Sequence, residues 1–145
     1  MEIYTIGFTQ TSAEHFFDRL AQAGVRRLLD VRLKNTSHLA GFAKSGDLPF
    51  FLERLNGIRY DHEPLLAPSE ELLSAYRKRQ MDWSTYEEDF IELLAAREVQ
   101  SQLDPEAFKT PTVLLCSEAT ADCCHRRLVC EYLSQHWGQL HAEHL

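Results

Sequence analysis

The sequence has no cysteine in its first 115 residues, and its four cysteines all lie between Cys116 and Cys130. A secreted disulfide-rich protein spreads its cysteines along the chain to close several loops. The clustering therefore excludes a disulfide scaffold. It favours a reducing compartment, and we expect a cytoplasmic protein.

Long apolar runs are also missing. No stretch approaches the roughly 18–20 apolar residues that a membrane helix needs. Residues 1–9 lack the basic start and apolar core of a signal peptide. The net charge of −7 disfavours binding of nucleic acid through bulk electrostatics. We therefore expect no membrane contact, no signal peptide and no general nucleic-acid binding.

What remains is an ordinary composition, with 145 residues, 44% of them hydrophobic and 26% charged. This length fits one domain, which we expect to span residues 1–145. The charge is uneven. Residues 1–59 contain eight Lys/Arg against six Asp/Glu, whereas residues 60–145 contain seven against sixteen. A site for an anion should therefore draw on the first half of the chain.

Apolar, β-branched segments alternate with helix-forming segments along the chain. Strands are expected at residues 2–8, 26–32, 58–63, 112–118 and 139–145. Helices are expected to begin at Thr11, Asp47, Ser69, Ser84 and either Thr120 or Asp122, and to end near Gly24, Gly57, Gln80, Leu103 and Gly138. The alternation predicts a three-layer α/β fold of the Rossmann-like or flavodoxin-like type. Its sheet of about five strands would be mostly parallel, with helices on both faces.

The strongest candidate site lies where the fourth strand leads into the last helix. Such folds bind ligands outside the carboxyl ends of the strands. Cys116 and Glu118 end the expected strand, and Cys124-His125-Arg126 opens the helix. If Asp122 caps this helix, Cys124 and His125 are its second and third residues, beside free backbone N–H groups.

A thiol at a helix start, beside an imidazole and a guanidinium, is in a setting that lowers the pKa of cysteine. This predicts Cys124 as a nucleophile, with His125 and Glu118 as proton carriers and Cys116 beside them.

Three other interpretations of this segment stay open. The helix start and the Arg126 guanidinium could bind an anion with no covalent step. Cys116 and Cys130 suit simple core packing, because cysteine is among the most buried residue types. A metal-binding Cys/His site is the last, although the spacing lacks the paired C-x2-C of zinc sites and so predicts no metal ligands.

A second cluster follows the second strand. Asp30 and Arg32 stand at the end of this apolar strand, and Asp30 is expected to pair with Arg32 or Arg126. About 14 irregular residues come next, which is longer than most loops and often functional. Guanidinium, amide and hydroxyl groups suit a phosphate or carboxylate. The residues expected to bind the anion are Asp30, Arg32, Asn35, Ser37 and Arg126. The alternative is a salt-bridged strand end with a polar surface loop.

Other chemistry-bearing side chains have simpler interpretations. Tyr76, Trp83, Tyr86 and Phe90 are expected to pack in the core, since their spacing is helical or they lie in a loop. His62 ends a strand, where a structural role is the default.

Several motifs together resemble the domain of unknown function 488 family. They are Tyr4-Thr-Ile-Gly7, Leu29-Asp-Val-Arg32, Gly57-Ile-Arg-Tyr60, Leu114-Leu-Cys116-Ser-Glu118 and Cys124-His-Arg126. The resemblance implies a small cytoplasmic bacterial or archaeal α/β protein, and it supplies no activity. The positions that match its motifs are Asp30, Arg32, Cys116, Glu118, Cys124, His125 and Arg126. One departure is Phe8, where many members have histidine.

The function favoured by these patterns is an enzyme with an anion- or phosphate-binding pocket, acting on a small molecule or nucleotide. It would be a cysteine-dependent transferase or hydrolase. A non-catalytic ligand-binding or adaptor module with the same pocket is the alternative, and a metal-binding Cys/His site is the second alternative. The sequence does not decide between them, and it indicates no cofactor and no oligomeric state.

Overall fold

The structure, a computed structural model, describes residues 1–34, 41–44, 46–117 and 124–145. Within these residues, five parallel strands form one sheet in the order β3-β2-β4-β1-β5. The strands are β1 (Glu2–Gly7), β2 (Arg27–Asp30), β3 (Arg59–His62), β4 (Thr112–Cys116) and β5 (His141–His144). The predicted α/β fold is confirmed, including the fifth strand.

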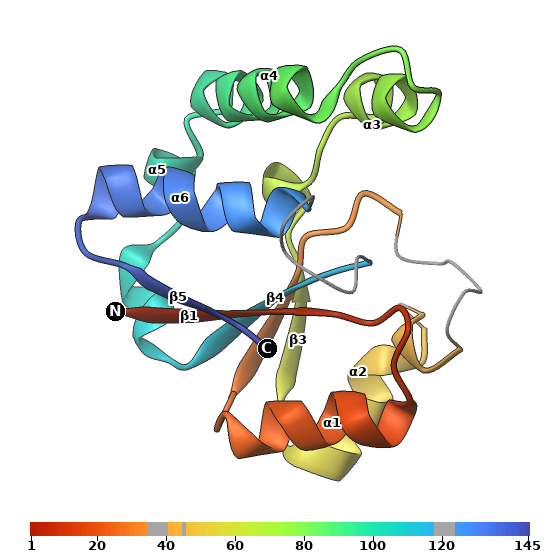
Figure 1. Ribbon diagram of the computed structural model, residues 1–145. Helices are drawn as coiled ribbons and strands as arrows, with labels where there is room; N and C mark the ends of the chain where they lie inside the picture. The colour runs from red at the N-terminus through yellow and green to blue at the C-terminus, as the bar shows by residue number, and fades with distance from the viewer. Residues whose placement is uncertain (35–40, 45, 118–123) are drawn as a thin grey trace.

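Helices cover both faces of the sheet (Figure 1). One face carries α1 (Ala13–Gln22) and α2 (Leu48–Phe51), which continues as the π-helical segment η2 (Leu52–Asn56). The other face carries α3 (Glu70–Arg77), α4 (Trp83–Ala96), α5 (Val99–Gln102) and α6 (His125–Trp137). This is the three-layer arrangement expected from the alternation of strands and helices. None of the helices in the described part of the chain combines the length and apolar character needed to cross a bilayer.

The central strand β4 shows why the sequence pattern was continuously apolar. All five of its residues are buried, because helices cover it from both sides. Val113 and Leu115 join the cluster that packs under α1, whereas Leu114 and Cys116 join the cluster that packs under α4 and α6. The alternation of a strand therefore directs the Cys116 side chain to the face where α6 begins.

The strand register brings the carboxyl ends of four strands to one edge. Gly7 pairs with Cys116, and Asp30 pairs with both Leu115 and His62. The chain leaves β2 toward α2 on one face and leaves β4 toward α6 on the other. Neighbouring parallel strands whose connections diverge in this way open a crevice between their ends, which is where ligands bind in such sheets.

Three helices begin at residues other than those expected, namely α1, α4 and, at the candidate site, α6. Ser12 caps α1 in place of Thr11, because its Oγ accepts from the His15 N–H at 3.1 Å. Asp82 caps α4 in place of Ser84, since its carboxylate accepts from the Thr85 N–H at 2.8 Å. A carboxylate at a helix N-terminus also interacts favourably with the helix dipole, so the earlier start is the more stable one.

Ser12→Ala is expected to lower the free energy of unfolding by about 1 kcal/mol, because it removes the acceptor for an N–H in the first turn of α1. Thr11→Ala is the matched control and should change it by less than about 0.5 kcal/mol. Urea denaturation followed by circular dichroism measures both. Equal losses for the two variants would show that Ser12 is not the cap.

The long helix expected up to Leu103 is interrupted. Glu98 has a left-handed backbone, with φ of 51°, and separates α4 from α5. Arg97 just before it donates from Nη1 to the carbonyls of Leu65 and Ala67, at 2.9 and 2.6 Å. The break therefore lies beside a tertiary contact that fixes the segment leading into α3.

Candidate functional site

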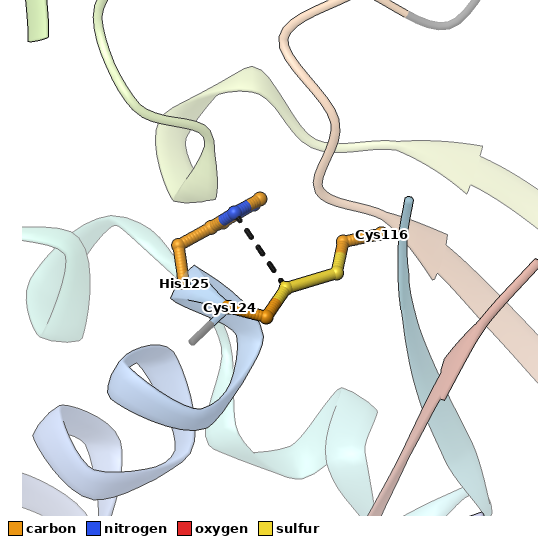
Figure 2. Close-up of side chains that lie close together, drawn as sticks. All are labelled: Cys116, Cys124 and His125. Carbon is orange, nitrogen blue, oxygen red and sulfur yellow. Dashed lines mark hydrogen bonds between the residues drawn. A yellow bond between two sulfur atoms is a disulfide. The ribbon is translucent and has the colours of Figure 1, made fainter. Parts of the chain in front are cut away.

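The start of α6 differs from the expected arrangement. The helix begins at His125, and Cys124 is its N-cap with extended backbone. Cys124 and His125 are thus not the second and third residues of this helix, while Thr120 and Asp122 lie outside the described residues. Because its backbone is extended, Cys124 does not follow the helical direction of His125, and its sulfur meets Cys116 at the end of β4. The structure joins these two cysteines in a disulfide, with Cα atoms 7.6 Å apart (Figure 2).

His125 is held in one orientation by the end of β2. Its Nε2 donates to the carbonyl oxygen of Val31 at 2.8 Å, so the other ring nitrogen carries the lone pair. That nitrogen, Nδ1, lies 4.0 Å from Cys124 Sγ (Figure 2). Burial lowers the pKa of His125 to about 4, and the positive charge of Arg126 acts in the same direction. In this disulfide-bonded state the imidazole is therefore neutral at neutral pH, with a lone pair facing the sulfur.

Arg126 is completely buried, and its Nη1 donates to Cys116 Sγ at 3.1 Å. A guanidinium in this position stabilises negative charge on the sulfur. The sequence-based hypothesis gave Arg126 to the anion site, whereas the structure places it against a cysteine of the same cluster.

The expected pair at the end of β2 is formed by Asp30 and Arg32. Arg32 Nε and Nη2 each donate to the Asp30 carboxylate at 2.8 Å, and Nη2 also donates to the Ala43 carbonyl at 2.7 Å. Tyr60 donates its hydroxyl to the same carboxylate at 2.6 Å. The Phe8 ring lies 5.0 Å from the Arg32 guanidinium carbon. The position where this chain departs from the motifs of the family it resembles is therefore in contact with this arginine.

One nitrogen of the Arg32 guanidinium makes no hydrogen bond with the described residues. This nitrogen, Nη1, is buried, and only 3% of the residue is exposed. A buried N–H of a charged group without a partner costs free energy, so it is an attractive place for an anion.

Arg32 and the cysteine cluster share a pocket of about 110 Å³. Its lining at this end includes Arg32, Cys116, Ser117, Cys124 and His125. The structure thus brings four of the predicted site residues together. Asn35, Ser37 and Glu118 lie outside the described residues, so their predicted roles stay predictions.

An aromatic wall of three rings also lines this pocket, in addition to the core packing that the sequence predicted. Tyr76 from α3 lies 4.9 Å from Tyr86, and Trp83 is stacked on Tyr86 at 5.0 Å. The expected core packing is confirmed, because Tyr86 and Phe90 are buried in the core and Tyr76 and Trp83 pack against it. Tyr76, Trp83 and Tyr86 line the pocket as well. The sequence does contain one indication of this wall, because three large aromatic residues lie within the eleven residues 76–86.

Two further cations line the pocket, Arg77 and Lys34, and Lys34 Nζ lies 3.7 Å from the exposed carboxylate of Glu70. No carboxylate is found among the lining residues that the structure describes. The pocket therefore combines positive charge with flat aromatic surface, which suits an anion attached to a planar group.

Two other residues with reactive side chains, His62 and Cys130, lie outside the pocket and make structural contacts. His62 Nε2 contacts the carbonyl oxygen of Arg32 at 2.9 Å and does not line the pocket. Cys130 packs in the core, where burial raises the pKa of its thiol to about 12. Cys130 is thus unreactive at neutral pH and serves as an internal reference for the cysteines of the site.

A model of the protein family described as Domain of unknown function DUF488 matches residues 12–133. The chain belongs to the DUF488 family. No curated protein and no solved structure matches it. The DUF488 match includes Asp30, Arg32, Cys116, Cys124 and His125, so the pocket lies within the part of the chain that defines the family. Its description assigns no activity, and the function therefore has to be argued from the geometry of the site.

Proposed function

We propose that this protein is a cysteine-dependent enzyme, a transferase or hydrolase, that acts on a small anionic molecule or nucleotide in the pocket between the ends of β2 and β4. The observation that carries the proposal is that Arg32, whose buried Nη1 has no partner among the described residues, lines the same pocket as Cys124 and His125. An anion-binding group and a candidate nucleophile thus face one space.

The anion would be bound by the Arg32 guanidinium. Asp30 accepts from Nε and Nη2 along one edge, so the remaining N–H groups are held in place before a ligand arrives. Lys34 and Arg77 add positive charge, and the aromatic wall offers a planar surface for a ring attached to the anion. A nucleotide and an aryl phosphate share both features.

The covalent step would use Cys124 in its reduced form. The disulfide with Cys116 is first reduced by a dithiol or by two monothiols, which supply two electrons and two protons and become a disulfide themselves. In the reduced state a negative charge on Cys124 Sγ favours the protonated form of His125, so the Cys124 proton passes to Nδ1 as the sulfur bonds to the electrophilic centre of the substrate. The bond to the leaving group breaks, and that group takes the proton from His125. Water in a hydrolase, or an acceptor hydroxyl or amine in a transferase, then bonds to the group held on the sulfur. Its proton passes through His125 Nδ1 to Cys124 Sγ as the bond to sulfur breaks, so the product leaves and the thiol is restored.

The test is the rate at which iodoacetamide alkylates each cysteine of the reduced, metal-free protein at neutral pH, read by mass spectrometry. We expect Cys124 to react at least about tenfold faster than glutathione, because a lowered pKa raises the thiolate fraction. Inorganic phosphate and a nucleoside monophosphate should each slow the reaction. Arg77→Ala should weaken this protection, whereas Lys78→Ala, its exposed neighbour that does not line the pocket, should leave it unchanged.

Two results would contradict the proposal that the protein is an enzyme. If Cys124 reacts no faster than glutathione and neither anion has an effect, the pocket holds neither an activated nucleophile nor an anion-binding site. If both anions bind but Cys124 stays slow, the alternative of a non-catalytic ligand-binding or adaptor module replaces it.

A further inference from the structure

A second kind of ligand fits the same cluster of side chains. Cys116 Sγ, Cys124 Sγ and a ring nitrogen of His125 all lie within 4.8 Å of one another. One sulfur comes from the end of β4, and the other two atoms come from consecutive residues at the start of α6 (Figure 2). Two thiolates and an imidazole are the ligands that zinc and related thiophilic divalent ions prefer.

Consecutive residues rarely point at one centre, and the local backbone explains how these do. Cys124 is extended, with φ of −136° and ψ of 139°, whereas His125 is the first helical residue. The change of backbone between them lets both side chains turn toward the end of β4. The sequence spacing alone disfavoured a metal because it gives no information about this change of direction.

The hydrogen bond of His125 to a backbone carbonyl is also typical of histidines that bind a metal. Such a histidine almost always donates its other ring N–H to a carboxylate, a backbone carbonyl or water, which fixes the ring and its tautomer. Here Nε2 donates to the Val31 carbonyl at 2.8 Å, and Nδ1 is left on the side of Cys124. This contact joins the candidate ligand to the end of β2.

The charges around the cluster are compatible with a divalent ion. Two thiolates balance its charge, and neutral His125 adds none. Arg126 donates to Cys116 Sγ at 3.1 Å, which is the kind of outer contact that stabilises a ligating thiolate. Ser117 and Arg32 line the pocket on which the two sulfurs open. A fourth ligand could come from solvent or from a molecule in that pocket, as in catalytic zinc sites.

We propose that the reduced protein binds one thiophilic divalent ion of the zinc class through Cys116 Sγ, Cys124 Sγ and His125 Nδ1. Each thiol gives its proton to solvent as the ion binds. The metal and the disulfide need the same two sulfurs, so they are mutually exclusive states. Metal binding also occupies the nucleophile of the proposed enzyme, so the metal-bound state is one in which Cys124 is blocked.

The test is a cobalt titration of the full chain, reduced with a phosphine and freed of metal by a chelator under anaerobic conditions. We expect thiolate-to-cobalt charge-transfer and tetrahedral d–d absorption bands that saturate at about one equivalent and disappear when zinc is added. Cys116→Ser and Cys124→Ser should each weaken binding at least about 100-fold, since even outer contacts of a metal site are worth 10- to 100-fold. Cys130→Ala, a buried cysteine outside the site, should bind like wild type.

Several results would overturn the metal site. These are the absence of the bands, saturation below about one-tenth equivalent, or wild-type affinity in both serine variants. Because a serine variant could fail to fold, circular dichroism is recorded for each, and wild-type protein gives a second measurement. Zinc should protect Cys116 and Cys124 from iodoacetamide, and protection that falls on Cys123 instead of Cys116 would contradict the assignment. The reactivity of Cys124 in metal-free protein is measured separately, so failure of the metal site and failure of the enzyme give different results.

Discussion

Asp30→Asn is expected to lower the free energy of unfolding by about 3–5 kcal/mol, because it leaves the buried Arg32 guanidinium without its counter-charge. Arg32 and Asp30 are 3% and 0% exposed and are joined by two hydrogen bonds of 2.8 Å. Asparagine has nearly the same volume, so the loss comes from charge and hydrogen bonding and not from a cavity. Urea denaturation followed by fluorescence measures it.

The matched control is Asp61→Asn on the neighbouring strand β3. Asp61 also pairs with an arginine, Arg59, at 3.1 Å, but that arginine is 74% exposed. Exposed pairs contribute about 0–1 kcal/mol, so this variant should be almost as stable as wild type. If both variants lose the same small amount, the Asp30–Arg32 pair does not stabilise this edge of the sheet. Such a result would also argue against an anion site that depends on Asp30 holding the Arg32 side chain in place.

The sheet could be predicted from the sequence because its pattern is local. Alternating apolar segments and helix caps indicated strands and helices, and parallel strands place all their carboxyl ends at one edge. Asp30 and Cys116 are far apart in the sequence, and only this rule indicated that they lie at the same edge of the sheet. The structure adds the register, in which Asp30 pairs with the residue that precedes Cys116.

The helix boundaries could not be predicted as well, because neighbouring residues compete for the same role. Thr11 and Ser12 can both cap a helix, and in the structure Ser12 is the cap, after a left-handed backbone at Gln10 with φ of 56°. Glu98 adopts a left-handed backbone without being glycine, so nothing in the sequence marks the end of α4. Both choices depend on contacts made after the chain has folded.

The errors at the site have the same origin. An N-cap was sought before Cys124, so the cysteine was assigned to the helix, although it precedes the helix and meets Cys116. The aromatic rings of α3 and α4 were correctly assigned to the core because their spacing is helical, but only the folded chain shows that Tyr76, Trp83 and Tyr86 also line the pocket. A periodic pattern indicates which side of a helix is apolar, but it does not show what that side faces.

His125→Gln is expected to slow the alkylation of Cys124 in the reduced, metal-free protein by about 10- to 30-fold at neutral pH. The glutamine amide can donate to the Val31 carbonyl as Nε2 does, at 2.8 Å in wild type, but it offers no lone pair at the position of Nδ1. The proton of Cys124 then has no acceptor within the site. A free thiol with a pKa near 8.5 is about 3% ionised at pH 7, so about 30-fold is the largest loss that this mechanism allows.

The matched control is His62→Gln. His62 ends the neighbouring strand, and its Nε2 also contacts a backbone carbonyl, that of Arg32 at 2.9 Å, but it does not line the pocket. Its replacement should leave the alkylation of Cys124 unchanged. An equal loss in both variants would mean that the histidines act by holding the strand ends together. A loss confined to His125→Gln would instead require the lone pair of Nδ1, since the contact with Val31 is retained. The two variants therefore separate a proton acceptor from a structural contact at the same edge of the sheet.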